Sequence, residues 1–135
     1  MSLLTWNSTY SVNIVEIDNQ HKKLIDLINQ LYDAKQAGAA DTIIQKVFNE
    51  LVSYTFTHFN YEESLLRKAN YSDLAEHCDI HKSIVERVRN LQKQYNDGSA
   101  TAINDTLEFM KNWLMKHIAG TDKKYSQELN AAGIR

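Results

Sequence analysis

The sequence has 135 residues, of which 43% are hydrophobic and 24% charged, the size and makeup of one globular domain with a real core. Its 15 basic and 17 acidic residues give a formal charge of −2 and are spread along the chain, which argues against a nucleic-acid-binding surface. No apolar run approaches the roughly 18–20 residues of a membrane span, no secretory leader is recognisable, and the single cysteine cannot form an internal disulfide. We therefore expect a cytoplasmic protein without a membrane span.

Hydrophobic residues recur at alternating steps of three and four through a chain that contains no proline, and this pattern predicts helices throughout. Asp18 is expected to cap the first helix. Because the connections are short, consecutive helices should run antiparallel, which gives an all-α, up-down-up-down four-helix bundle. The expected single domain spans residues 1–135, with an N-terminal arm at about 1–13 and helices at about 18–37, 41–68, 73–95 and 101–128.

The most informative feature of the sequence is the spacing of its five histidines relative to one another and to two carboxylates. Side chains four residues apart on a helix lie on the same face, with Cβ atoms roughly 5–6 Å apart, so both can reach one ion. One histidine stands alone and the others fall into three short motifs: His21; His58 with Glu62; His77 with His81; and His117 with Asp122. The spacing predicts a two-metal site shared among four helices.

The surroundings of these histidines support the metal hypothesis. His77 and His81 interrupt the hydrophobic stripe that runs from Leu74 to Leu91, and the other three histidines lie in similar stripes. A single histidine in such a place is more often a core residue that hydrogen-bonds to a backbone carbonyl. Five of them, with two carboxylates, would be costly to bury without compensation, and a metal provides it.

Asp122 requires a local departure from the α-helix. A step of five residues turns an ideal helix by about 500°, which leaves Asp122 about 140° away from His117. Gly120 lies between them, and an extra residue in one turn is what a π-bulge supplies. The alternative is that Asp122 is a solvated carboxylate near the end of the last helix.

The order His, His-x-x-x-Glu, His-x-x-x-His, His-x-x-x-x-Asp resembles that of the hemerythrins, and more closely the single-domain bacterial members of that family. The resemblance extends from Trp6 to Tyr125. It includes the residues around the first histidine (17–24) and those before the last carboxylate (113–118). Asn13 departs from the pattern, because bacterial relatives often have glycine there, and this bears on the arm and not on the site.

The resemblance implies a non-haem di-iron centre with an oxo or hydroxo bridge. It assigns His77, His81 and His117 to one iron. It assigns His21 and His58 to the other, with Glu62 and Asp122 as bridging carboxylates. The expected function is reversible dioxygen binding for storage, transport or delivery, without enzymatic activity.

Reversible binding requires a dry pocket beside the iron that keeps an open position. The residues that flank His58 and His117 are candidates for its lining, and they could equally be ordinary bundle core: Phe59, Trp113, Leu114 and Ile118. Beyond dioxygen, an oxygen-consuming enzyme is a candidate partner. The expected oligomeric state is a monomer.

Three alternatives remain open. Ferritin-like di-iron enzymes also use a four-helix bundle, but their Glu-x-x-His motif is absent from this sequence. A dioxygen or redox sensor would use the same ligands, although no signalling domain is fused here. A zinc site could recruit Cys78, which we otherwise interpret as a small core residue.

Overall fold

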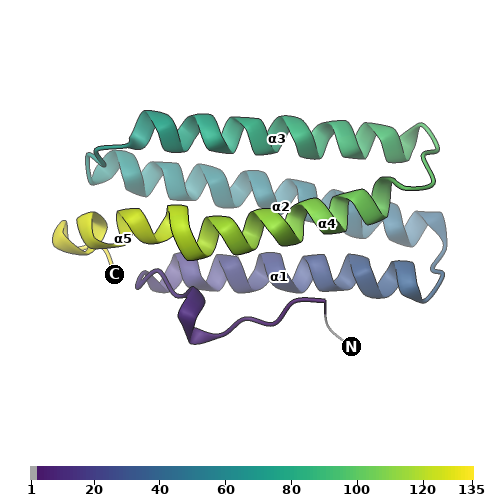
Figure 1. Cartoon of the computed structure of the whole chain (residues 1–135), viewed down its shortest axis with the longest axis horizontal. Coiled ribbons are helices and arrows are strands. Elements are labelled where there is room, and N and C mark those ends of the chain that lie inside the picture. Colours follow the sequence, from purple (N-terminus) through teal and green to yellow (C-terminus); the bar gives the residue numbers. More distant parts are fainter. Residues whose placement is uncertain (1–2) are drawn as a thin grey trace.

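The structure is a computed structural model. It describes residues 3–135, except for the side chains of residues 119 and 121. All secondary structure within these residues is helical, which confirms the predicted fold class. A short 3₁₀ helix (η1, Ser8–Tyr10) in the arm precedes α1 (Val15–Gln36), α2 (Asp41–Lys68), α3 (Leu74–Asn96), α4 (Ala102–Lys116), the π-helix η2 (His117–Thr121) and α5 (Asp122–Ala131). Figure 1 shows the long helices side by side.

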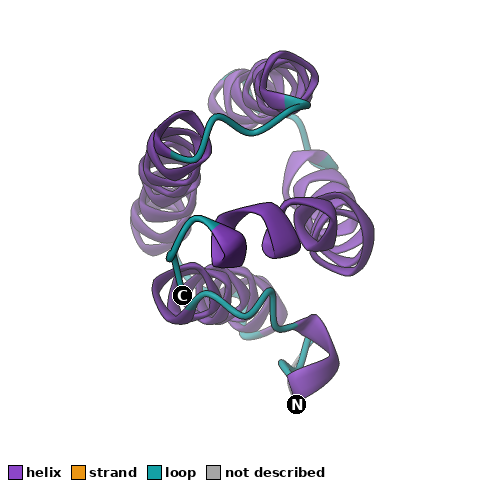
Figure 2. Cartoon of the chain, turned by 90° about the vertical axis from the view of Figure 1, so that its left-hand side faces the viewer, coloured by secondary structure: helices purple, strands orange, loops and turns teal. Residues whose placement is uncertain are grey.

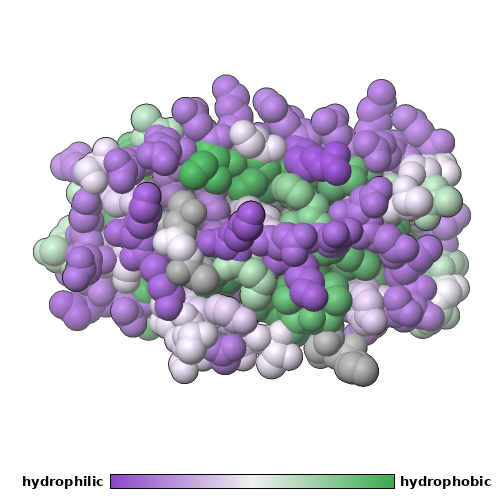
Figure 3. Space-filling model, in the orientation of Figure 1, coloured by the Kyte–Doolittle hydropathy of each residue, from purple (hydrophilic) through white to green (hydrophobic). Residues whose placement is uncertain are grey.

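The four long helices form a closed ring around a cluster of buried hydrophobic residues, and a second cluster lies where the arm and α5 meet the bundle. α1 packs against α2 and α4, and α3 packs against the same two helices. Figure 2 looks along the bundle and shows the ring, with the last helical segment turning across the near end. Hydrophilic residues cover most of the face in Figure 3. None of the helices in the described part of the chain is long and apolar enough to cross a bilayer.

The stripes of hydrophobic residues in the sequence account for the core. On α1, the buried residues Leu24, Ile28 and Leu31 follow steps of three and four. Leu107 and Leu114 on α4, seven residues apart, also face the interior. α1 and α3 end just before Gly38 and Gly98, respectively. These glycines adopt positive φ angles of 66° and 93°, which let the chain turn back with the hydrogen bonds of a Schellman motif.

The first helix begins earlier than predicted, and Asp18 is not its N-cap. Asn13 has a φ of 59°, a left-handed conformation that explains why glycine suits this position. The chain therefore turns before α1, and the Asp18 carboxylate accepts hydrogen bonds from the Ser11 hydroxyl at 2.5 Å and the Val12 amide at 2.9 Å. Of the arm predicted at 1–13, residues 1 and 2 lie outside the described residues.

The predicted fourth helix, 101–128, is interrupted. The π-helix η2 separates α4 from α5, as the spacing of His117 and Asp122 requires, and helical structure continues to Ala131. α5 is tied to the arm, because the Ser126 hydroxyl donates to the Val12 carbonyl at 2.5 Å and the Asn130 amide donates to the Asn13 carbonyl at 3.1 Å. These bonds fix α5 relative to the arm.

Candidate metal centre

The structure brings all seven predicted ligand residues together in two groups. The first group contains a carboxylate and three histidines: Glu62, His77, His81 and His117. The second contains two histidines and two carboxylates: His21, His58, Glu62 and Asp122. Within each group one ligand atom per residue lies within 4.8 Å of all the others, and Glu62 belongs to both groups.

The antiparallel arrangement explains why these residues meet. His21 lies in the first half of α1, whereas His58 lies in the second half of the oppositely directed α2. His77 begins α3, and His117 follows the last residue of α4. All of these positions fall in the half of the bundle that is nearer the connection from α2 to α3; this connection is on the left of Figure 1.

The Glu62 carboxylate lies between the two groups. Its Oε2 is 3.2 Å from the Nε2 of His58, while its Oε1 is 3.1 Å from the Nε2 of His81 and in close contact with His77. Asp122 approaches from α5, with its Oδ2 3.1 Å from the Nε2 of His21. Its Oδ1 is 3.3 Å from the Nε2 of His117. The two oxygens of each carboxylate therefore face histidines of both groups.

The donor atoms are buried and many lack partners. None of the seven side chains is more than 4% exposed. The Nε2 atoms of His58, His81 and His117 and both carboxylate oxygens of Asp122 have no hydrogen-bond partner among the described residues. Buried polar atoms without partners are rare in folded proteins, and a metal ion would satisfy them. The residues present therefore fit a metal centre.

The protonation of the site also favours a cation. Burial lowers the pKa of His117 to about 3 and lowers that of His21, so both rings are neutral and can bind metal. Burial works to raise the pKa of Glu62, but the close approach of the His58, His77 and His81 rings lowers it well below the usual range. Burial and the nearby Glu62 charge raise the pKa of Asp122 well above its usual range. Positive ions between the two carboxylates would let both ionise.

Two contacts around the ligands were not predicted. The Nδ1 of His58 lies 2.7 Å from the buried Gln20 Oε1, so this nitrogen carries the proton and Nε2 points into the site. The Tyr125 hydroxyl donates to the Glu62 Oε2 at 3.2 Å. The Tyr125 contact could have been predicted, because Tyr125 stands three residues after Asp122 on the same face of α5. The sequence gives no comparable indication for Gln20 beyond its place beside His21.

Two of the four residues predicted to line a dioxygen pocket contact ligand rings, and the other two are buried in the bundle. Phe59 stacks on His81 with ring centroids 3.9 Å apart, and Trp113 lies 5.3 Å from His117. Leu114 and Ile118 are completely buried. These contacts suit a dry lining and also belong to the bundle core, so the pocket stays a prediction.

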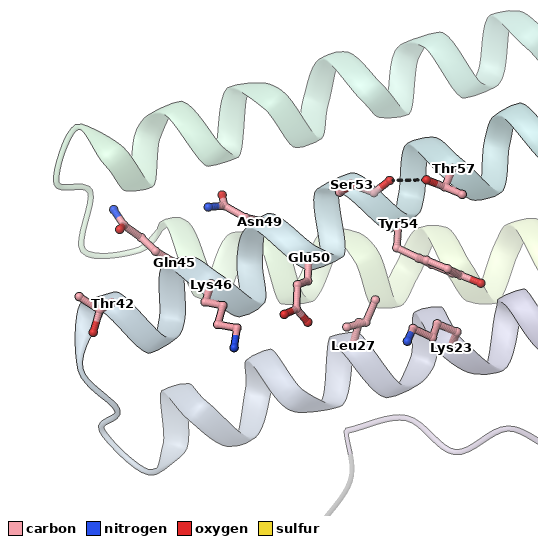
Figure 4. Close-up of a pocket in the computed structure, with 10 residues that line it drawn as sticks. All are labelled: Lys23, Leu27, Thr42, Gln45, Lys46, Asn49, Glu50, Ser53, Tyr54 and Thr57. Atoms are coloured by element: carbon pink, nitrogen blue, oxygen red, sulfur yellow. Dashed lines mark hydrogen bonds between the residues drawn. The ribbon is translucent and has the colours of Figure 1, made fainter.

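One surface hollow lies outside this cluster and another reaches its edge. A groove of about 690 Å³ runs between α1 and α2, and Figure 4 shows Lys23, Leu27, Lys46 and Glu50 along it. None of the seven candidate ligands lines this groove. A second hollow, of about 480 Å³, lies between α2 and α3 and reaches the edge of His81.

Cys78 is half-buried and belongs to neither group of candidate ligands. Its thiol donates to the Glu63 carboxylate at 3.0 Å, and burial together with this hydrogen bond raises the thiol pKa to about 11. The thiol is therefore protonated at neutral pH and is a poor metal ligand. Its place at the edge of the second hollow differs from the core position expected from the sequence.

The helical bundle and the buried cluster together define a metal-binding protein, and comparisons with known proteins identify its family. The model of the "Hemerythrin HHE cation binding domain" matches residues 12–129. The bacteriohemerythrin of Methylococcus capsulatus is 35% identical over 97% of this chain and all of its own length. That of Pseudomonas aeruginosa is 36% identical, covering 93% of this chain and 80% of its own. The chain belongs to the hemerythrin family.

Solved structures agree with this assignment. A crystal structure of wild-type hemerythrin superposes with a TM-score of 0.86 at 34% sequence identity, and the match covers 95% of this chain and 98% of that one. A mutant hemerythrin gives a TM-score of 0.87 at the same identity. The similarity therefore includes the whole bundle.

Proposed function

We propose that this protein binds dioxygen reversibly at a non-haem di-iron centre with an oxo or hydroxo bridge. The observation that carries the proposal is the division of the cluster into two groups that share Glu62. In this assignment His77, His81 and His117 hold one iron. The remaining histidines, His21 and His58, would hold the other and would leave it an open position for dioxygen. Glu62 and Asp122 bridge the pair.

The charges of the proposed centre are balanced. Two ferrous ions carry four positive charges, and two carboxylates with one hydroxide carry three negative charges, which leaves a low net charge that a nonpolar interior can hold. Neutral imidazole suits iron and adds no negative charge. Two ferrous ions bound by these residues would supply the electrons needed for dioxygen binding.

The surrounding side chains would keep the site dry. Leu114 and Ile118 are completely buried, and Phe59 and Trp113 form an aromatic layer over the ligands, with ring centroids 5.4 Å apart. Water in the site would favour irreversible oxidation of the irons. The Tyr125 hydroxyl, by its hydrogen bond, holds the Glu62 carboxylate in its bridging orientation.

The proposed dioxygen binding implies a cellular location, an oligomeric state and a partner for the protein. We place the protein in the cytoplasm as a monomeric, single-domain, non-enzymatic dioxygen store or carrier, with an oxygen-consuming enzyme as the recipient. A sensor of dioxygen or redox state and a di-iron oxidase are the alternatives. A sensor would release dioxygen slowly, and an oxidase would consume it with a substrate.

The test is the visible spectrum of the iron-loaded protein with its metal content. We expect about two irons per chain, no colour after anaerobic reduction, a charge-transfer band on exposure to air, and bleaching when dioxygen is removed. One zinc per chain would contradict the di-iron assignment. A colour that persists under vacuum would contradict reversible binding.

A further inference from the structure

Glu63 lies on the outer side of the metal centre, although it follows Glu62 directly in the sequence. Its Oε2 is 3.1 Å from the Nδ1 of His81, the ring nitrogen that points away from the cluster. The Nε2 of the same ring faces the Glu62 carboxylate. Glu63 is 16% exposed, at the edge of the hollow between α2 and α3, whereas Glu62 is completely buried.

Other side chains hold the Glu63 carboxylate in this orientation. The Cys78 thiol of α3 donates to its Oε1 at 3.0 Å. Arg67, one turn further along α2, approaches the same oxygen at 3.4 Å. Because one oxygen is held by these two donors, the other remains directed at His81. The carboxylate thus connects α2 to α3 at the level of the proposed centre.

The histidines differ in what their outer nitrogens contact. His58 pairs with the neutral amide of Gln20, and the Nδ1 of His21 has no hydrogen-bond partner among the described residues. His81 is the one whose Nδ1 pairs with a carboxylate in the described hydrogen bonds. The negative partner therefore falls on the three-histidine side of the cluster, away from the proposed open position.

We propose that Glu63 is a positioning residue for the metal bound by His81. By accepting the Nδ1 proton, it fixes the tautomer that leaves the Nε2 lone pair free for the metal, and it makes the ring a stronger donor. Its negative charge stabilises the ferric state of the three-histidine iron over the ferrous state. This inference rests on the di-iron centre proposed above.

The experiment compares the iron-loaded full chain with two variants of Glu63. Glu63→Ala removes both the acceptor and the charge, and we expect metal affinity to fall roughly 10–100-fold, measured by competition with a chelator. Glu63→Gln retains an acceptor oxygen without the charge. It should keep near-wild-type metal affinity but show a higher reduction potential and a shifted charge-transfer band. Glu50→Ala, an exposed carboxylate of the same helix, is the matched control.

Each outcome decides a different question. If both Glu63 variants match Glu50→Ala in metal affinity, potential and spectrum, Glu63 has no positioning role. If Glu63→Ala only lowers the melting temperature of the metal-free protein, Glu63 merely joins two helices, and the proposal is again wrong. Glu63→Gln keeps the test available if Glu63→Ala does not fold. Failure of the wild-type chain to bind two irons would instead refute the proposed function.

Discussion

His117 and Asp122 are separated by five positions in the sequence, yet the Nε2 of His117 lies 3.3 Å from the Oδ1 of Asp122. In an uninterrupted α-helix the two side chains would point about 140° apart. The π-helix η2 accommodates one additional residue in this turn and brings the second carboxylate back to the cluster. The contact thus depends on the number of residues in the turn.

Inserting one alanine after Gly120 should add a second extra residue to this turn and rotate α5 by about 100°. We expect Asp122 to leave the cluster and iron content to fall below two per chain. Gly120→Ala is the matched control, because an added Cβ meets nothing within 4 Å and φ is not positive. That variant should bind two irons with stability equal to wild type or up to about 1 kcal/mol higher. Full iron binding after the insertion would show that η2 does not position Asp122.

Replacing His77 or His81 with Ala should cost one metal ion and lower the melting temperature of the loaded protein. Either change leaves the remaining buried donors without a complete partner set. Lys82→Ala, on the exposed side of the same helix, serves as the control. The measurements are iron content and melting temperature. If a histidine variant matches this control in both, that histidine is not a metal ligand.

Leu114→Ala should affect both stability and dioxygen chemistry. Loss of a completely buried leucine costs roughly 2–5 kcal/mol, and the space created beside His117 should admit water and speed oxidation of the irons. Leu107→Ala, seven residues earlier on the same helix, should cost a similar free energy of unfolding without changing the oxidation rate. The measurements are denaturant unfolding and the decay of the oxygenated spectrum.

Leu114→Tyr separates polarity from space, because it fills the site and adds a hydroxyl. We expect the spectrum to shift and the oxygenated form to decay faster, with two irons retained. A variant that folds, binds two irons and keeps the wild-type spectrum and decay rate would show that Leu114 does not face dioxygen.

The low pKa of His117 predicts acid sensitivity of the metal-free protein. Burial holds this pKa at about 3, against about 6.5 in the unfolded chain, so between these pH values only the unfolded state binds the proton. The free energy of unfolding should therefore decrease as pH falls through this window, by up to about 1.4 kcal/mol per pH unit for this group. His117→Gln should weaken the decrease in urea unfolding at pH 7 and pH 5. An unchanged pH dependence in the variant would place the effect elsewhere.

Local sequence patterns predicted the helices and the clustering of the seven residues because both depend on spacing within a helix. His58 and Glu62 share a face in any α-helix, whatever surrounds them. The antiparallel order then decides which ends meet. Even the η2 turn could be predicted, because Asp122 could reach His117 in no other way.

The features that spacing did not predict arise from contacts between segments. Asp18 stands where the sequence pattern predicts an N-cap. The left-handed conformation of Asn13 turns the chain before α1, so the Asp18 carboxylate binds Ser11 and Val12 and does not cap the helix. Gln20 directly precedes His21, and Glu63 directly follows Glu62. On a helix, neighbouring residues point in different directions, so neither side chain was expected to contact a histidine. Their hydrogen bonds to histidines on other helices depend on how the helices are rotated, which periodicity does not specify.

All candidate ligands lie in the half of the bundle nearer the α2–α3 connection, which implies that metal binding stabilises the two halves of the molecule unequally. Unfolding a helix around its ligand would release that ligand, so bound metal adds to the free energy of every such fluctuation. The opposite end, with the turns at Gly38 and Gly98, can fray without disturbing the centre. Amide hydrogen exchange should therefore slow on metal loading around His21, His58 and His77, and remain unchanged beside the two glycine turns.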